Sequence, residues 1–327
     1  MFKTLAYVGL FVAAVATATA VGCGGSSNNG TPDFTVVGDG FNGGGDGGDM
    51  NVIDKMYVAA TPHDVDTNTI GGNLSKGTAV KMSGLIVLAP PYGFSAKITV
   101  AKDACKYEIY AQDPSCSTPP CGIVLETPAI INPMGTGMFC PYAKDTSTAL
   151  KTIWRGDKVD VQGVVDTFSS SAMSPATGTV VQHSITIDSL TQVSKMNTLP
   201  TPIVVADTAT SMFKPYSGAG WAMYEGTYIE LKPPTGMTTF TTTLAVVPTA
   251  SVTCAGQIGS PFKSNGSFTT TQGASFADTF NTFFVPKDGG VINCYPPNGS
   301  VFHGIQAIVG TVFGGSLLPA DSADFIP

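Results

Sequence analysis

The sequence predicts an all-β fold built from two small barrels in tandem behind a disordered tether. Three observations predict it. The chain of 327 residues contains 38 Gly and 23 Pro but only 12% charged residues, and its Thr and Val recur in short alternating runs that favour strands over helices. Four strand-like runs contain a glycine in mid-run, and in three of them the apolar residues change side there. Those glycines form two pairs with similar spacings of 79 and 84 residues: Gly84 with Gly163, and Gly226 with Gly310.

Residues 1–22 predict a lipoprotein signal peptide. Lys3 precedes an apolar run, and Ala20-Val21-Gly22 leads into Cys23 and a polar stretch. This resembles the lipobox of secreted bacterial lipoproteins, whose cysteine receives palmitate-type acyl chains and becomes the first mature residue. An ordinary secretory signal or an uncleaved anchor is the alternative, although the apolar run is short for a spanning helix. The resemblance implies an exported, membrane-anchored protein, and Gly at positions 24 and 25 favours the outer membrane or cell surface.

Residues 23–60 predict a disordered tether rich in Gly and Asp. The segment from Gly24 to Leu74 holds seven Asp and one Lys, and its first part has almost no apolar residues to bury. A calcium-binding β-roll repeat is the alternative at Gly44–Asp49. One copy is present where several must stack, and Asn51 replaces the apolar residue that the repeat needs. We therefore expect a linker and no cofactor.

The first predicted barrel covers residues 61–200. In the run 80–87 the apolar parity changes at Gly84, which indicates a β-bulge or a sharp bend, and 158–165 repeats this at Gly163. Strands are also expected at 107–113 and 122–124. A capping run followed by apolar residues predicts a short helix at Asp145–Trp154, before an Arg155-Gly156-Asp157 turn.

The second predicted barrel covers residues 201–327. Ile305, Ala307 and Val309 precede Gly310, and the run 225–231 contains Gly226. Phenylalanines at helical spacing predict a short helix at Ser275–Phe284. Each half therefore has strands, a short helix and then a bent strand, which is the order of a five-stranded OB barrel.

These runs, with Pro200–Val205 leading into Tyr224-Glu225-Gly226, resemble the OB-like modules attached to bacterial extracellular nucleases and found in related envelope lipoproteins. The resemblance covers about residues 65–232, and the nuclease domain has no counterpart in this chain. It rests on glycines and alternation, so it implies a fold more than a function.

The seven cysteines divide into one and six. If Cys23 is acylated, the other six form an even set in an exported protein, where disulfides are the default. Fifteen pairings exist. The split between the halves favours Cys254 with Cys294, and the Pro-containing loop Cys116–Cys121 can close on itself, which leaves Cys105 with Cys140. A metal site would need Cys-x-x-Cys spacing or interleaved His, which are absent.

The best candidate ligand surface lies on the first barrel. Aromatic and lysine side chains on an OB face hold single-stranded nucleic acids or sugars, although aromatics in small barrels are also common as core residues. Residues 75–200 contain ten Lys and Arg against nine Asp and Glu, so nucleic-acid binding is expected to be weak. The candidate residues are Tyr92, Phe94, Lys97, Lys106 and Tyr110.

Enzymatic patterns are sparse. His63 lies beside Asp64 and Asp66, a grouping more typical of a turn than of a ligand set, and His183 and His303 share the parity of core residues.

We therefore expect a lipid-anchored, non-catalytic binding or structural module of the bacterial envelope surface. Its expected partners are the membrane and a protein or glycan. The alternatives are a secreted hydrolase or nuclease-associated protein centred near His63, and a weak single-strand or glycan binder.

Overall fold

The computed structural model divides the chain into two units, Met1–Val52 and Ile53–Pro327. The predicted signal peptide, Cys23 and nearly all of the tether lie outside the described residues. No helix in the described part is long and apolar enough to cross a membrane. The structure describes residues 55–65, 74–99, 102–131, 150–169, 181–205, 213, 220–233, 236–248, 258–260, 267–270, 274–277, 300–310 and 316–327.

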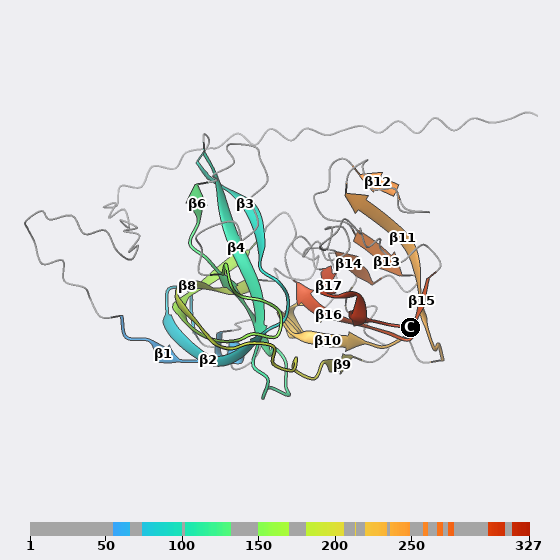
Figure 1. The fold of residues 1–327 in the computed structure, drawn as a ribbon, viewed down its shortest axis with the longest axis horizontal. Helices are drawn as coiled ribbons and strands as arrows, with labels where there is room; N and C mark the ends of the chain where they lie inside the picture. Colours follow the sequence, from blue (N-terminus) through green and yellow to red (C-terminus); the bar gives the residue numbers. More distant parts are fainter. Residues whose placement is uncertain are drawn as a thin grey trace, which may run out of the picture. The chain divides into compact units, whose positions relative to one another are not determined.

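The described chain is mostly β-sheet with a few short helices, which confirms the predicted all-β class (Figure 1). Its strands form one sheet from residues before 200 and another from residues after 200. The short helices are α1 (Pro62–Val65), α3 (Gly220–Met223) and the 3₁₀ turn η4 (Ser322–Asp324).

The first sheet has the strand order β1-β2-β7-β8-β5-β4-β3, with β6 paired to β4. β2 also pairs with β4 at Ile86↔Gln112 and Val87↔Ala111. The strands β2, β7, β8, β5 and β4 therefore pair in sequence, and β4 pairs back to β2. This last pairing between β4 and β2 consists of only two residue pairs. The strands are β1 (Val58–Ala59), β2 (Ala79–Val87), β3 (Tyr92–Thr99), β4 (Lys102–Gln112), β5 (Gly122–Glu126), β6 (Ile130–Ile131), β7 (Lys158–Ser169) and β8 (Val181–Ser194).

The glycine-marked bends of this sheet are confirmed. The β2–β7 register shifts between Met82 and Leu85, around Gly84, whose φ of 75° is accessible mainly to glycine. The β7–β8 register shifts at Gly163, where a Cβ would lie 2.3 Å from the carbonyl oxygen of Thr186. The bend at Gly84 lets Val80 and Met82 before it and Leu85 and Val87 after it enter one core. At Gly163 the predicted change of parity is wrong, because Val165, and not Val164, joins Val159 and Val161 in that core.

The second sheet has the order β12-β11-β13-β14-β17-β16-β10-β9, with β15 paired to β11 and β18 to β16. Its strands are β9 (Ile203–Val205), β10 (Tyr228–Leu231), β11 (Phe240–Pro248), β12 (Ile258–Ser260), β13 (Ser267–Thr270), β14 (Ser275–Ala277), β15 (Val301–Phe302), β16 (Gly304–Gly310), β17 (Ser316–Leu318) and β18 (Phe325–Ile326).

The helix predicted at Ser275–Phe284 is wrong at its start, because Ser275–Ala277 forms strand β14. Phe276 is fully buried and pairs with Phe268 on one side and Leu317 on the other. Strands β13 and β17 pair with β14 on its two sides. This tertiary pairing overrides the helical spacing of the phenylalanines. Residues 278–284 lie outside the described part. Of the other predicted helix, the described residues 150–152 form a turn, and 145–149 are not described.

The two sheets repeat one order of pairing. In the first, β1 runs parallel to β2, β2 and β7 pair antiparallel, β7 and β8 pair antiparallel, and β8 runs parallel to β5. In the second, β9, β10, β16, β17 and β14 follow with the same alternation of directions. The expected Gly226 position differs from that of Gly84, because Gly226 lies in the turn before β10 (Tyr228–Leu231) and Gly84 lies within β2. Within the described strands, no pairing of β11 with β10 closes the second sheet.

Candidate functional site

The outer face of β4 forms the contact between the two sheets. Side chains alternate along a strand, so Tyr107 and Ile109 enter the core of the first sheet while Tyr110 and Gln112 face the second. The apolar part of the contact is fully buried. It contains Leu88, Ala89, Tyr110 and Val124 from the first half and Tyr228, Ile308, Leu318 and Ala320 from the second.

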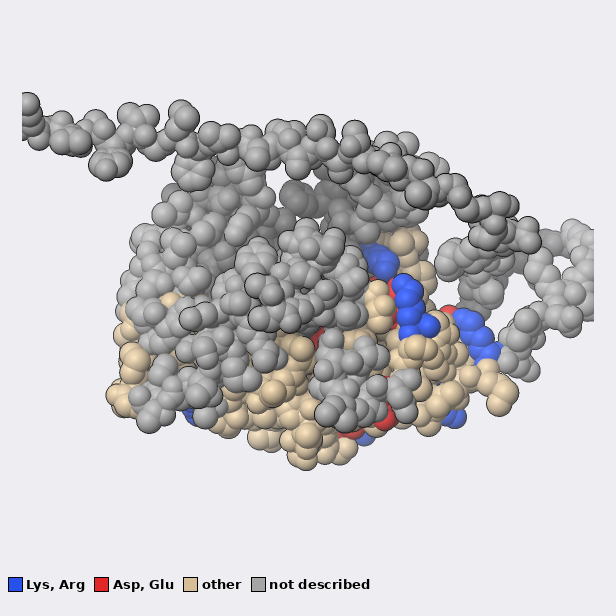
Figure 2. All heavy atoms as spheres, turned by 180° about the vertical axis from the view of Figure 1, so that it is seen from behind, with Lys and Arg blue, Asp and Glu red and all other residues tan. Residues whose placement is uncertain are grey.

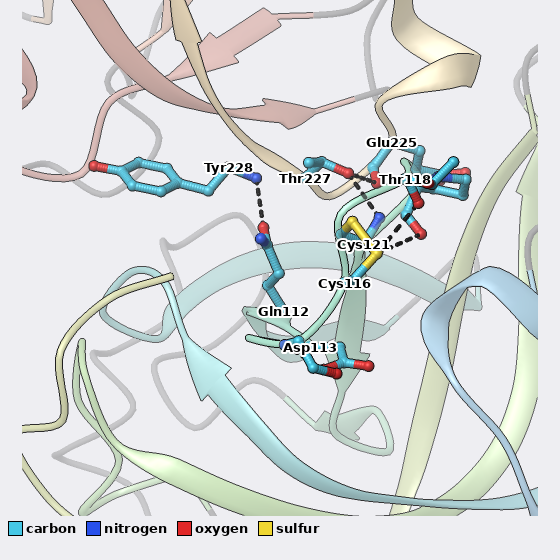
Figure 3. The surroundings of a disulfide bond; sticks show 10 residues. Gln112, Asp113, Cys116, Thr118, Cys121, Glu225, Thr227 and Tyr228 are labelled. Atoms are coloured by element: carbon cyan, nitrogen blue, oxygen red, sulfur yellow. Dashed lines mark hydrogen bonds between the residues drawn. A yellow bond between two sulfur atoms is a disulfide. The ribbon is translucent and has the colours of Figure 1, made fainter. Parts of the chain in front are cut away.

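The predicted disulfide between Cys116 and Cys121 is present, and its loop lies against the second sheet (Figure 3). The backbone N–H of Cys121 donates to Thr227 Oγ1 at 2.9 Å. A Cβ on Gly122 would lie 1.9 Å from the carbonyl oxygen of Gly226, whose own φ is 64°. The two backbones therefore approach each other at a point where neither glycine has room for a side chain.

Cys105 is also disulfide-bonded and is fully buried in the first core. Its expected partner Cys140 lies outside the described residues, as do Cys254 and Cys294. Those two pairings stay predictions.

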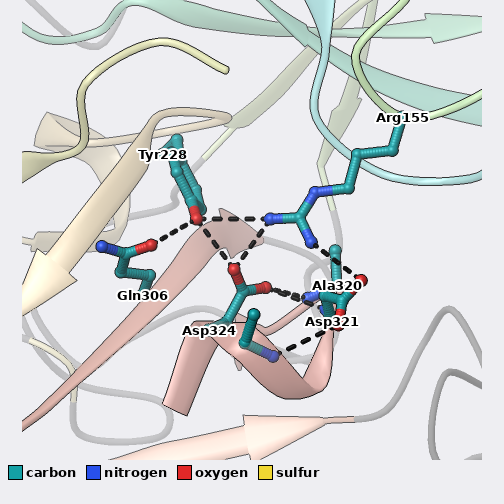
Figure 4. A network of polar contacts seen from close by, with 7 residues as sticks. Arg155, Tyr228, Gln306, Ala320, Asp321 and Asp324 are labelled. Atoms are coloured by element: carbon teal, nitrogen blue, oxygen red, sulfur yellow. Dashed lines mark hydrogen bonds and ion pairs between the residues drawn. The ribbon is translucent and has the colours of Figure 1, made fainter. Parts of the chain in front are cut away.

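Arg155 connects the turn before β7 to the C-terminal segment of the chain (Figure 4). Its Nη2 donates to Asp324 Oδ1 at 2.7 Å and to the Tyr228 hydroxyl at 3.3 Å, and Nη1 lies 3.7 Å from Asp321. The other Asp324 oxygen accepts backbone N–H groups of residues 320 and 321. The predicted Arg-Gly-Asp turn is thus confirmed, with a φ of 86° at Gly156, and its arginine holds the two halves together.

The Tyr228 hydroxyl lies 2.7 Å from Gln306 Oε1 and 2.8 Å from Asp324 Oδ1. Burial raises the pKa of Tyr228, and the charge of Asp324 raises it further, against the opposing effect of Arg155. The phenol therefore stays protonated at any physiological pH and serves as a hydrogen-bond donor in this contact.

Two buried carboxyl groups lie side by side on the same outer face. Glu108 on β4 is directly opposite Glu126 on β5. Tyr92 donates to Glu108 Oε2 at 2.6 Å, and Lys106 forms an ion pair with Glu126 at 2.8 Å. Burial raises the pKa of Glu108 to about 8, and the neighbouring Glu126 adds to this, whereas Tyr92 and Lys106 oppose it. Near neutral pH the pair therefore holds a proton on Glu108.

The predicted ligand face partly coincides with this buried cluster. Lys106 and Tyr110 share a face of β4 as expected, but Tyr110 is 2% exposed and packs in the contact between the sheets. The polar ends of Tyr92 and Lys106 contact carboxylates. Phe94 and Lys97 lie on β3 opposite Lys106 and Asp103, and their side chains are outside the described part. The ligand face stays a prediction.

The three histidines lie in different environments. His183 is buried, as expected at a core edge. Its backbone N–H donates to Glu225 Oε1 at 2.7 Å, and its ring Nδ1 lies 2.8 Å from Glu225 Oε2. This pair again joins the two halves. The core-edge expectation for His303 is wrong. It is exposed at a bend between β15 and β16, and the interrupted strand does not carry its parity across.

His63 is in α1, and the adjacent Asp64 caps that helix by accepting the Thr61 N–H and hydroxyl, both at 2.8 Å. The neighbouring Asp66 lies outside the described residues. Across the part of the chain that the structure describes, no group of three or more His, Cys, Asp and Glu is placed to hold a metal ion. Figure 2 shows a described surface that is mostly uncharged, with Lys and Arg in a few small groups.

Sequence alternation alone did not identify Glu108, Glu225, Arg155 or Asp324 as contact residues. The available signal was the occurrence of charged residues in otherwise apolar strands and turns.

No known protein family matches this chain. No curated protein matches it either. Among solved structures, the small single-stranded DNA-binding protein from Streptomyces coelicolor is similar at 11% identity, with a TM-score of 0.21, over 36% of this chain and 95% of that one. A similarity of this size supports no conclusion about the function of this chain.

Proposed function

We propose that the protein is a lipid-anchored, non-catalytic binding or structural module of the bacterial cell envelope surface. The observation that carries the proposal is that charged side chains of this protein form ion pairs between the two halves of the chain. His183 with Glu225 is a buried pair, Arg155 with Asp324 is a partly buried pair, and both join one half of the chain to the other. Such pairs favour a fixed arrangement of two parts.

The proposal includes two OB-like barrels in tandem. For the first sheet it is supported by the ring of pairings β2-β7-β8-β5-β4-β2, with β5 and β8 parallel, which is the order of a partly open five-stranded barrel. For the second it is supported by the repeated pairing order. Deletion of residues 201–327 should leave the first half poorly folded, because it exposes Leu88, Tyr110 and Val124.

The anchor is tested by replacing Cys23 with Ser in the full chain. Acyl chains on this cysteine hold the mature protein in the membrane fraction, since two or more chains give stable attachment. The variant should appear in the soluble fraction or remain unprocessed, while wild-type protein sediments with outer membranes. A correctly cleaved Cys23→Ser protein that still sediments with membranes contradicts the anchor.

The expected partner is a protein or a glycan. Nucleic acid is disfavoured by the balanced charge of the first half, because few counterions are released on binding. Fluorescence anisotropy with a labelled single-stranded oligonucleotide at physiological salt should show weak binding that fades as salt rises. Submicromolar binding to the oligonucleotide contradicts this assignment.

A further inference from the structure

Two neighbouring turns at one end of the first sheet carry exposed apolar side chains. Trp154, in the turn before β7, is 61% exposed, and Met196, in the turn after β8, is 92% exposed. The turns are fixed to each other, because the backbone N–H of Asn197 donates to the Gly156 carbonyl at 2.7 Å and the Asn197 amide donates to it at 3.0 Å. Val193 at the end of β8 is also half exposed.

These side chains are exposed on an ordered backbone. The backbone N–H of Trp154 donates to Asp157 Oδ2 at 2.8 Å, and the backbone N–H of Asp157 donates to the Trp154 carbonyl at 3.1 Å. Met196 has a φ of 54°, a conformation that residues other than glycine rarely adopt. Arg155, the residue after the tryptophan, is engaged with Asp324. The exposure of Trp154 is therefore a property of the fold, and Trp154 and Met196 lie on two turns that are held together.

The charges around these turns are positive. Lys151 and Lys195 are exposed, and Lys158 is partly exposed where β7 begins. The nearby acids are already engaged. Asp157 is buried and accepts from Trp154 and Gln192, and Asp160 accepts the Gly84 N–H at 2.7 Å. Residues 150–160 and 191–199 contain Lys151, Arg155, Lys158 and Lys195 against Asp157 and Asp160, so their charge is net positive and the exposed charged side chains are lysines.

We infer that Trp154, Val193 and Met196, with Lys151, Lys158 and Lys195, form a membrane-contact surface that rests on anionic lipid headgroups. The inference builds on the proposed lipid anchor, which would keep this surface close to the bilayer. Tryptophan prefers the boundary between headgroups and acyl chains, because its ring is apolar and its N–H is polar. Lysines beside it attract anionic lipids over a distance of about one Debye length.

The chain is suited to a direct test because it has two tryptophans, and Trp221 is 2% exposed in the second core. Acylated full-length protein is reconstituted in phosphatidylcholine vesicles with and without phosphatidylglycerol, and tryptophan quenching by brominated lipids is measured. Quenching and a blue shift of the emission should appear with the anionic lipid and weaken at high salt. Both should be lost in Trp154→Phe and reduced in Lys151→Glu/Lys195→Glu.

The matched control is Lys76→Glu, a lysine on another part of the surface paired with Asp166, which should leave the quenching unchanged. Protein that stays anchored but shows no Trp154 quenching with either vesicle overturns the membrane-contact surface and leaves the proposed function standing. Equal quenching with and without anionic lipid overturns the role of the lysines. Failure to associate with any vesicle overturns the anchor as well.

Discussion

Replacement of Glu108 by Gln removes the proton-binding group of the buried carboxyl pair on the outer face of β4. The side chain is 3% exposed, accepts from Tyr92 and lies opposite Glu126. An amide keeps the size of the group and can accept from Tyr92 and donate to Glu126, but it does not titrate. The variant should therefore differ from wild type mainly in how its stability depends on pH.

The pKa of Glu108 is raised from 4.5 to about 8, mainly by burial. Between these values the folded protein holds a proton that the unfolded chain has released, so stability is complete below pH 4.5 and falls as pH rises toward 8. The loss is about 1.4 kcal/mol per pH unit over most of that window. From pH 6 to pH 8 the Glu108 carboxyl should therefore lower the free energy of unfolding by about 2 kcal/mol.

Urea unfolding of the disulfide-intact protein at pH 5, 6, 7, 8 and 9 measures this. Wild type should lose about 2 kcal/mol more than Glu108→Gln between pH 6 and pH 8. Asp188→Asn is the control, because Asp188 pairs with Lys55 at the surface and its replacement should leave the slope unchanged. Equal slopes for wild type and Glu108→Gln refute the reasoning, since they mean that Glu108 releases its proton in the folded state as readily as in the unfolded chain.

Two substitutions test the contact between the halves, and a thiol titration tests the disulfides. Gly122→Ala should lower the free energy of unfolding by about 1–3 kcal/mol, measured in urea, because its Cβ overlaps the Gly226 carbonyl; wild-type stability would contradict that approach. Arg155→Met should cost roughly 1.5–3 kcal/mol by removing the charged donor to the buried Asp324, and Asp324→Asn in the same chain should recover part of it; an additive double variant would argue against the pair. Thiol titration of the denatured, unreduced protein should find no reactive thiol at Cys105, Cys116 or Cys121, and modification of any of them would exclude its disulfide.

The sequence by itself determined features that are encoded within a few residues. Alternation and composition predicted the all-β class. The change of parity at Gly84 predicted a bend, because only glycine occupies that backbone conformation at low cost. The short loop from Cys116 to Cys121 predicted its own disulfide.

Only the tertiary structure decided which partner each face meets. Alternation separates Tyr110 from Ile109 on β4, but both faces of that strand are buried, and the pattern does not say which one meets the second sheet. Phe276 lies in a strand because two other strands flank it. Arg155 donates a hydrogen bond to Asp324, which is 169 residues away in the sequence. The energies that fix these choices are packing, desolvation and ion pairing between distant segments, and such terms exist only once the chain has folded.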